Sequence, residues 1–303
     1  MNVREIVVQG ILDALDKGVV PWRCPWNQPS AKPMNLYRRR RYSGTNWFLL
    51  SLAASLAGFG PYWLTLHEVH KLEGRVRKSE FGRFVPVVIY KPLPPNVTDD
   101  EDEEKRTRML LRYYKVYNYD QTEGIDLPSD LKPLEVQEHD PVATAEAIVL
   151  AMPEPPQMEC RGNKAYYRPA DDLVVTPPRN LFYTIEAYYA TLFHELGHAT
   201  GHSSRLFRPE LMEMAAWSDA SYSREELVAE ITSAMLCAEA GIDPQIESSA
   251  AYIQTWLKTL QNDKQMVLYA AAKAEQATSF ILGRGQPHSI ETQIAYTNEY
   301  TRR

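Results

Sequence analysis

The sequence has only three cysteines among its 303 residues, Cys24, Cys160 and Cys237, and they lie far apart. Their odd number and wide spacing exclude the kind of disulfide framework that holds small secreted domains together. They also provide no Cys-x-x-Cys pair for binding a metal. Any metal site in this chain must therefore use histidine and carboxylate ligands.

Long apolar runs are absent as well. The longest, from Phe48 to Phe59, contains two serines and a glycine and is far shorter than the ~20 residues that a membrane-spanning helix needs. The N-terminal segment, residues 1–8, lacks the basic start and continuous apolar core of a secretory signal. We therefore expect a cytoplasmic protein with no membrane segment.

The net charge of −6 conceals an uneven distribution of charge along the chain. Residues 1–91 carry 14 Lys and Arg against 6 Asp and Glu, whereas residues 92–303 carry 19 against 33. A basic first third joined to an acidic remainder indicates two parts with different partners, of which the first favours a polyanion.

Hydrophobic periodicity and turn residues give a coarse map of the secondary structure. The predicted helices are residues 3–17, 46–57, 142–151, 184–200, 223–241, 248–261 and 263–280. The predicted strands are residues 62–65, 84–90 and 113–119, with short extended pieces around 165–175. A polar, acidic stretch between the last two strands is predicted to be a long mobile excursion. Prolines near residues 125–140 indicate a boundary, so we expect an α+β protein with two domains, residues 1–130 and 140–303.

One short motif carries most of the chemistry, His194-Glu195-Leu196-Gly197-His198. On an α-helix, two residues four apart lie ~40° apart around the axis and ~6 Å apart along it, so both imidazoles can bind one metal ion. Glu195 then lies beside the metal, where it can accept a proton from bound water, as in zinc hydrolases of the H-E-x-x-H type. The structural alternative is that both histidines are ordinary polar residues of a half-buried helix.

A catalytic zinc needs a third protein ligand, which the motif does not supply. The metzincin spacing would require a third histidine where the sequence has Ser204. A later predicted helix carries Glu226 and Glu230 on one face, so we predict Glu226 as the ligand and Glu230 as the carboxylate that orients a ligand imidazole. Glu225 is the main competitor for the ligand position. Alternatively, these carboxylates decorate an exposed helix surface.

Weaker candidates surround this site. His202 and Tyr222 are candidates for stabilising an oxyanion, although the sequence slightly favours a structural role for His202 as a cap of the helix end. Residues 172–176 are predicted either as an edge strand that pairs with a peptide or as a core strand.

The N-terminal part combines aromatic and basic residues, which suits single-stranded nucleic acid because unpaired bases stack and phosphates need neutralising. The candidate DNA-binding residues are Trp22, Arg23, Trp26, Arg38, Arg39, Arg40, Arg41, Tyr42, Asn46, Trp47, Lys71, Arg75, Arg77 and Lys78. No helix-turn-helix, zinc-finger or basic-zipper signature indicates reading of duplex sequence. The structural alternative is that many of the aromatics are core residues and that the arginine run is a solvated loop.

Motifs along the whole chain resemble the ArdC-type antirestriction proteins of conjugative plasmids. The matching segments are Gly18-x-x-Pro21-Trp22, Tyr42-x-Gly44-x-Asn46, Trp63-Leu64-Thr65, Gln121-Thr122-Glu123-Gly124, the run from His194 to Leu206, and Glu225-Glu226-Leu227-Val228-Ala229-Glu230. The sequence departs from the family pattern in its acidic residues 99–104 and at Ala199. Neither departure affects the predicted metal ligands.

The resemblance implies a small N-terminal α+β domain that binds single-stranded DNA, joined to a mainly helical zincin-like metallopeptidase domain with a small sheet. The implied cofactor is Zn²⁺, with another divalent metal such as Mn²⁺ as the alternative, and the implied role is protection of incoming plasmid DNA during conjugation. A host protein is then a candidate peptidase substrate. Two other interpretations remain: a DNA-binding protein with a purely structural metal, and an accessory to conjugative DNA priming.

Overall fold

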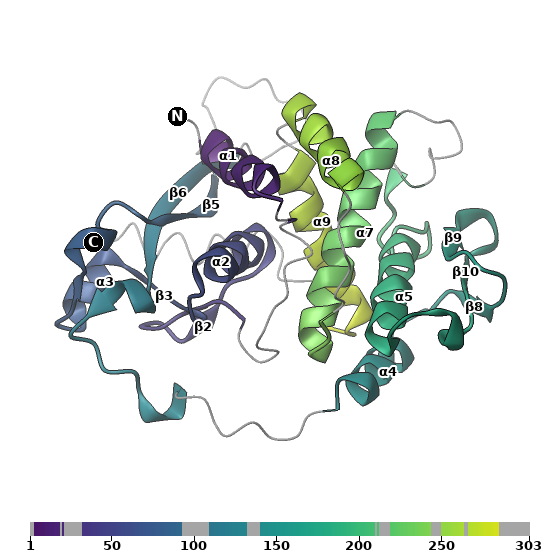
Figure 1. Cartoon of the computed structure of the whole chain (residues 1–303), viewed down its shortest axis with the longest axis horizontal. Helices are drawn as coiled ribbons and strands as arrows, with labels where there is room; N and C mark the ends of the chain where they lie inside the picture. Colours follow the sequence, from purple (N-terminus) through teal and green to yellow (C-terminus); the bar gives the residue numbers. More distant parts are fainter. Residues whose placement is uncertain are drawn as a thin grey trace, which may run out of the picture.

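The structure, a computed structural model, describes residues 3–18, 20, 32–92, 109–131, 140–209, 211, 219–243, 250–263 and 266–284. A sheet-containing N-terminal half, residues 3–131, lies beside a mainly helical C-terminal half, residues 140–284 (Figure 1). None of the described helices is long and apolar enough to cross a membrane.

The N-terminal half is built on a five-stranded sheet with the strand order β2-β1-β3-β6-β5. The strands are β1 (Met34–Asn35), β2 (Arg40–Arg41), β3 (Tyr62–Thr65), β5 (Val85–Pro92) and β6 (Met109–Asn118). Only the β1–β3 pair is parallel. Helices α1 (Val3–Asp16), α2 (Gly44–Ala57) and α3 (Leu66–Lys71) complete this half, with a small ribbon of β4 (Arg75–Val76) and β7 (Thr122–Glu123).

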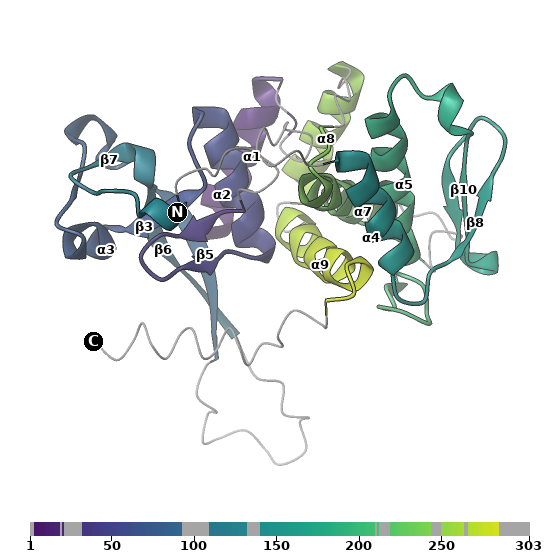
Figure 2. The same ribbon diagram turned by 90° about the horizontal axis from the view of Figure 1, so that it is seen from below.

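The C-terminal half consists mainly of helices, with one small sheet. Its helices are α4 (Pro141–Ala151), α5 (Ile185–Ala199), α7 (Asp219–Ala240), α8 (Ala250–Asn262) and α9 (Met266–Ile281), and its strands are β8 (Gln157–Cys160), β9 (Tyr166–Arg168) and β10 (Leu173–Thr176). Helix α5 lies between α7 and the small sheet (Figure 2). The α+β class is confirmed.

Of the two alternatives predicted for residues 172–176, the core strand is confirmed and the edge strand is wrong. The order of the small sheet is β8-β10-β9, so β10 is the central strand, parallel to β8 and antiparallel to β9. All four of its residues are buried, as expected for a strand with neighbours on both sides. Strand β8 was missed, because its four residues, Gln157–Cys160, are too few to establish a period and include no β-branched or aromatic residue. The strands left at the edges are β8 and β9.

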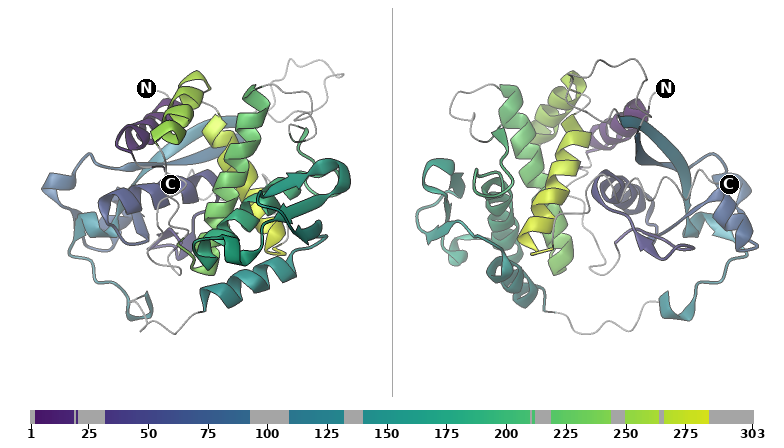
Figure 3. Two further views of the ribbon diagram at one scale, coloured as in Figure 1. Left: turned by 45° about the vertical axis from the view of Figure 1, so that its right-hand side comes forward. Right: turned by 180° about the vertical axis from the view of Figure 1, so that it is seen from behind.

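A single hydrophobic core joins the two halves. It contains Ile11 of α1 and Phe48 of α2 together with Leu227 of α7, Leu260 of α8 and Val267 of α9, each 1% exposed or less. Helix α9 lies beside α7 on the side that faces α2 (Figure 3). The two expected domains, residues 1–130 and 140–303, therefore meet through buried apolar side chains, as the interior of one domain does.

We expect Phe48→Ala to destabilise both halves. Removing the buried ring from the shared core should lower the free energy of unfolding by about 3–5 kcal/mol. The matched control is Leu56→Ala on the same helix, where the side chain is 48% exposed and the loss should stay below ~1 kcal/mol. Hydrogen exchange under native conditions should show faster exchange in α7 and α9 as well as in α2. Faster exchange confined to α2 would contradict a shared core.

Candidate metal centre

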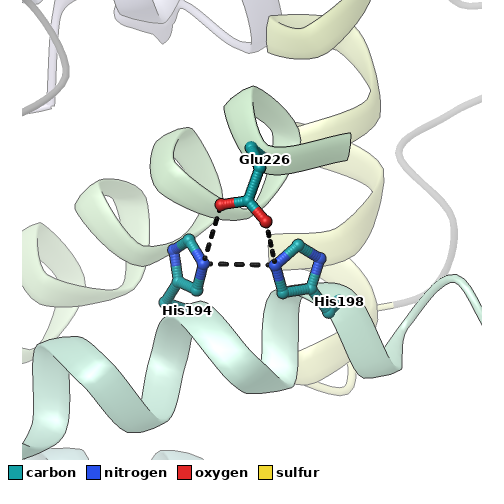
Figure 4. A group of neighbouring side chains, drawn as sticks. All are labelled: His194, His198 and Glu226. Carbon is teal, nitrogen blue, oxygen red and sulfur yellow. Dashed lines mark hydrogen bonds and ion pairs between the residues drawn. The ribbon is translucent and has the colours of Figure 1, made fainter. Parts of the chain in front are cut away.

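Three side chains from two helices converge on one point. His194 and His198 come from α5 and Glu226 comes from α7, and their ligand atoms all lie within 4.8 Å of one another. The two Nε2 atoms are 3.1 Å apart, and the two carboxylate oxygens of Glu226 each lie 3.5 Å from one of them. Figure 4 shows the three groups pointing toward one another.

This geometry fits a divalent metal ion. Two ligand atoms placed ~2.1 Å from a tetrahedral ion are separated by ~3.4 Å, close to the observed nitrogen–nitrogen and nitrogen–oxygen distances. The donor set of two imidazoles and one carboxylate is that of zinc enzymes with an open coordination position. The side chains of His194 and Glu226 are 21% and 23% exposed, so solvent reaches the site on one side.

The close approach of α5 to α7 brings the ligands together. At Gly197, between the two histidines, an added β-carbon would lie 3.2 Å from Cα of Ala229 and 3.3 Å from Cβ of Thr232. Both distances are shorter than ordinary van der Waals contact, so glycine lets the helix axes approach at this level. The start of α5 is fixed separately, because the Thr184 side chain accepts a hydrogen bond from the backbone N–H of Ala187.

Glu225 contacts the other side of the His198 ring. Its Oε1 lies 3.3 Å from Nδ1 of His198, and its carboxylate accepts hydrogen bonds from Nε and Nη2 of Arg208 at 2.8 and 2.6 Å. Because Glu225 lies against Nδ1 of His198, it leaves Nε2 to face His194 and Glu226, and it does not belong to the group of three. Glu230 lies one turn beyond Glu226 on α7, and its predicted orienting role stays a prediction.

The pKa shifts show that the site attracts positive charge. Burial lowers the pKa of His198, but Glu225 and Glu226 outweigh it and raise the value to about 10. Burial raises the pKa of Glu226, but His194 and His198 outweigh it and hold that pKa far below its usual range. The carboxylates thus stabilise a cation where the imidazole nitrogens meet.

Glu195 is buried next to this cluster. Burial raises its pKa, while His198 and His194 oppose that shift, and the backbone N–H of Tyr167 on β9 donates a hydrogen bond to its carboxylate. Strand β9 is held in place by Arg205, whose guanidinium binds Asp172 and lies 3.4 Å from the Tyr167 hydroxyl. The edge strand nearest to Glu195 is therefore β9.

Two arginines after α5 hold the elements around the site together, although no role was predicted for them: Arg208 bridges α5 and α7, and Arg205 joins the end of α5 to the small sheet. Arg205 belongs to the motif run that carries the family resemblance, but nothing in that run indicates its contacts. Arg208 is 1% exposed, and its guanidinium bridges α5 and α7. The only signal in the sequence is two arginines three residues apart after a metal-binding helix, and surface loops have the same pattern.

Two further residues of the C-terminal half, His202 and Tyr222, were predicted as candidates for stabilising an oxyanion. His202 lies in the turn after α5 with Nδ1 2.8 Å from Oγ of Ser204, and it does not belong to the group of three ligands. The side chain of Tyr222 lies outside the described residues. Their predicted contributions to an oxyanion site stay predictions.

The structure divides the predicted DNA-binding residues into several groups. Trp22, Arg23 and Trp26 lie outside the described residues, as do acidic residues 99–104. Trp47 is buried in the shared core, and Asn46 exchanges two hydrogen bonds with the backbone of Val88, so the fold itself uses these two side chains. The predicted surface role is therefore corrected for both.

The basic residues are mostly exposed, and several have acidic or carbonyl partners. The contacts are Arg38 with Glu68, Arg39 with Asp130, Arg75 with Glu123, and Arg77 with the carbonyl of Asp120. Arg40 and Arg41 form the exposed edge strand β2. Lys71 and Lys78, which lie on either side of Arg75 and Arg77 in the sequence, are also exposed. Tyr42 is half-buried, with its hydroxyl 3.4 Å from Nδ2 of Asn35.

The group of His194, His198 and Glu226, with Glu195 buried beside it, is the arrangement of a zincin-like metallopeptidase domain. Comparison of the C-terminal half with known proteins agrees. Residues 143–273 match the zincin-like metallopeptidase family, and residues 1–117 match the N-terminal domain of anti-restriction factor ArdC.

Solved structures extend the match to nearly the whole chain. The metal-free crystal structure of the antirestriction protein ArdC from plasmid R388 is 32% identical, with a TM-score of 0.71, and the match covers 94% of this chain and 98% of that one. The Mn(II)-bound structure of the same protein has a TM-score of 0.72 at the same identity and coverage. The chain belongs to the ArdC antirestriction protein family.

Two sequence relatives complete the comparison. An uncharacterised protein, y4eC of Sinorhizobium fredii, is 32% identical over 292 residues, covering 92% of this chain and 91% of the relative. A DNA primase TraC of Escherichia coli is 34% identical over 297 residues, but this chain spans only 20% of that primase.

Gly197→Ala tests the contact between α5 and α7. Alanine favours a helix over glycine by ~1 kcal/mol, but overpacking against Ala229 and Thr232 should outweigh that gain and leave a net loss of about 1–2 kcal/mol in unfolding free energy. Ala147→Gly at an exposed position of α4 is the control that measures the propensity difference alone, with an expected loss of ~1 kcal/mol. Chemical denaturation gives both values. A Gly197→Ala protein more stable than wild type would show that the helices are not in tight contact.

Proposed function

We propose that this protein binds single-stranded DNA, carries a zinc-dependent peptidase-type site, and protects incoming plasmid DNA from restriction during conjugation. The observation that carries the proposal is the group of His194, His198 and Glu226 with Glu195 beside it, in a chain that matches ArdC over nearly its full length. The protein would act in the cytoplasm, where transferred DNA meets restriction enzymes.

Zinc suits the donor set best, since two imidazoles and one carboxylate form the ligand set of many catalytic zinc sites. Mn²⁺ is the alternative, and the R388 ArdC structure with Mn(II) supports it. The partial exposure of His194 and Glu226 favours a site open to water over a closed structural site, which has four protein ligands.

Glu195 would act as the general base. A divalent metal bound by the three ligands would lower the pKa of a coordinated water and polarise a substrate carbonyl. Glu195 would accept the proton from that water and deliver it to the leaving amine. Its buried carboxyl group, whose pKa is raised, is suited to holding a proton between these two steps.

An extended peptide, such as a segment of a host protein, would bind along β9. This strand is an edge of the small sheet, and its Tyr167 backbone contacts Glu195, so a peptide paired with it would pass close to the metal. His202 and Tyr222 are retained as candidates for stabilising the oxyanion.

Single-stranded DNA would bind to the basic surface of the N-terminal half. Arg40, Arg41, Lys71 and Lys78 are the exposed cations that support this proposal, with Arg38, Arg39, Arg75 and Arg77 adding positive charge beside their partners. Trp22, Arg23, Trp26 and Tyr42 remain candidates for base stacking or phosphate contact. The partial match to primase TraC also favours association with DNA, and it is the observation behind the alternative of an accessory to priming.

Glu195→Gln separates metal binding from catalysis. The variant should retain the metal, because its three ligands are intact, and should lose peptidase activity by at least ~10²-fold through loss of the general base. Glu186→Gln, the same substitution in the first turn of α5, is the control and should behave as wild type. Metal content and cleavage of an unstructured protein substrate are measured together.

The same variants are then compared in plasmid transfer into restricting and non-restricting recipients. The proposal predicts that Glu195→Gln loses protection in the restricting recipient only. Full protection by this variant would assign the antirestriction function to the DNA-binding half.

Arg40→Gln/Arg41→Gln tests the DNA-binding surface. If both arginines contact phosphates, the double variant should bind a labelled single-stranded oligonucleotide more weakly, and the slope of log affinity against log salt should fall by roughly 0.7 per lost contact. Lys164→Gln/Lys258→Gln removes two exposed charges from the C-terminal half and should leave both quantities unchanged. Fluorescence anisotropy at several salt concentrations gives the slopes. Equal losses in both double variants would indicate a general effect of net charge.

A further inference from the structure

Arg208 is a buried cation that the chemistry described above does not use. It is 1% exposed, and it reaches both helices of the metal centre. At the end of α5 its Nη2 donates to the carbonyl of Gly197 at 2.8 Å, and its Nη1 donates to Oγ1 of the capping residue Thr200 at 2.7 Å. On α7 it forms the bidentate pair with Glu225.

We propose that Arg208 is a positioning residue for the metal site, acting through Glu225 on His198. The inference rests on the proposed metal site. Glu225 is also 1% exposed, and its Oε1 both accepts from Nη2 of Arg208 and lies 3.3 Å from Nδ1 of His198. The chain from Arg208 through Glu225 to His198 thus ends on the ring atom opposite the one that faces the metal.

Charge balance explains why an arginine is needed. Glu225 and Glu226 are neighbours on α7, and two carboxylates beside one metal would compete for it. The guanidinium of Arg208 neutralises Glu225 and engages both of its oxygens, so that only Glu226 faces the two Nε2 atoms. A buried carboxylate without this partner would be uncompensated.

Geometry provides the second reason. A guanidinium is planar and presents its donors in a fixed fork, so Arg208 can bind the Glu225 carboxylate and the end of α5 at the same time. Lysine offers a single ammonium group and cannot reproduce these four contacts. Arg208 therefore fixes Glu225, and with it the adjacent Glu226, relative to the histidines on α5.

Arg205 is the matched control within the same loop. Its side chain is 1% exposed and also binds the end of α5, through the carbonyl of Ala199 at 2.8 Å. Its carboxylate partner is Asp172 next to the small sheet, not a neighbour of a metal ligand. Substituting either arginine removes an ion pair, which is buried for Arg208 and partly buried for Arg205, but only Arg208 is connected to His198.

The experiment measures Zn²⁺ affinity by competition with a chelating dye for wild type, Arg208→Lys, Arg205→Lys and Glu225→Gln. Folding is followed by circular dichroism, and the visible spectrum of the Co²⁺-loaded proteins reports ligand geometry. We expect Arg208→Lys and Glu225→Gln to bind Zn²⁺ about 10–100-fold more weakly, the usual effect of losing an outer partner of a ligand. Their Co²⁺ spectra should change, whereas Arg205→Lys should stay within about twofold of wild type and keep the spectrum.

The double variant Arg208→Lys/Glu225→Gln should bind Zn²⁺ no more weakly than the weaker single variant, because both changes interrupt one path. Wild-type affinity in folded Arg208→Lys, or an equal loss in Arg205→Lys, would overturn the inference. If Arg208→Lys does not fold, the Zn²⁺ affinity of Glu225→Gln tests the inference in its place. Wild-type Zn²⁺ affinity in Glu225→Gln would then overturn the inference. Failure of the wild-type protein to bind Zn²⁺ or Mn²⁺ would instead overturn the metal site itself, and this inference with it.

Discussion

At Gly197, helix α5 lies so close to α7 that a β-carbon would stand 3.2 Å from the backbone of Ala229. This contact sets the distance between the helix that carries His194 and His198 and the helix that carries Glu226. Without it, the carboxylate could not approach both imidazoles at 3.5 Å. The rest of the C-terminal half supports this packing, with Arg208 bridging the two helices and Arg205 holding the small sheet against the end of α5.

Helix α7 has a second role on its other faces. Leu227 and Ile231 belong to the core shared with α1 and α2, whereas Glu225 and Glu226 turn toward the metal centre. The N-terminus of α2 is also held from the C-terminal half, because the backbone of Gly44 bonds to the carboxyl group of Glu275 on α9. Two family models match the two halves separately, but in the structure the halves share one core. A destabilising substitution in one half therefore affects the other through buried contacts.

Local sequence signals were sufficient for much of the fold and of the site. The helices at residues 142–151 and 184–200 were located to within one residue, because Asp140 and Thr184 cap their first turns and mark where each helix begins. The pair His194 and His198 follows from helical geometry alone. Glu226 was predicted from its place on a later helix, and the structure brings its carboxylate to both imidazoles. The sequence could not separate it from Glu225, since two adjacent glutamates differ only in the direction each faces.

The remaining features depend on tertiary contacts that no local pattern contains. Whether β10 is central or at an edge depends on pairing with β8, whose exposed residues come from a separate segment of the chain. Trp47 and Asn46 follow the arginine run in the sequence and were therefore predicted to lie on the DNA-binding surface. Trp47 instead fills the core, and Asn46 binds the backbone of Val88, 42 positions away in the sequence. The pair of arginines after α5 gave no specific signal for Arg208, because a buried arginine and a solvated one cannot be distinguished in the sequence until the partner Glu225 is known.

The central claim is that the two imidazoles and Glu226 hold one divalent metal across α5 and α7. Anomalous diffraction from crystals of the Zn²⁺-loaded protein, recorded at the zinc edge, tests it most directly. The account predicts one strong peak about 2.0–2.2 Å from Nε2 of His194, Nε2 of His198 and an Oε of Glu226. Glu225 should remain on Arg208 and outside the coordination sphere. A peak elsewhere, or a zinc ion bound through Glu225, would contradict the account.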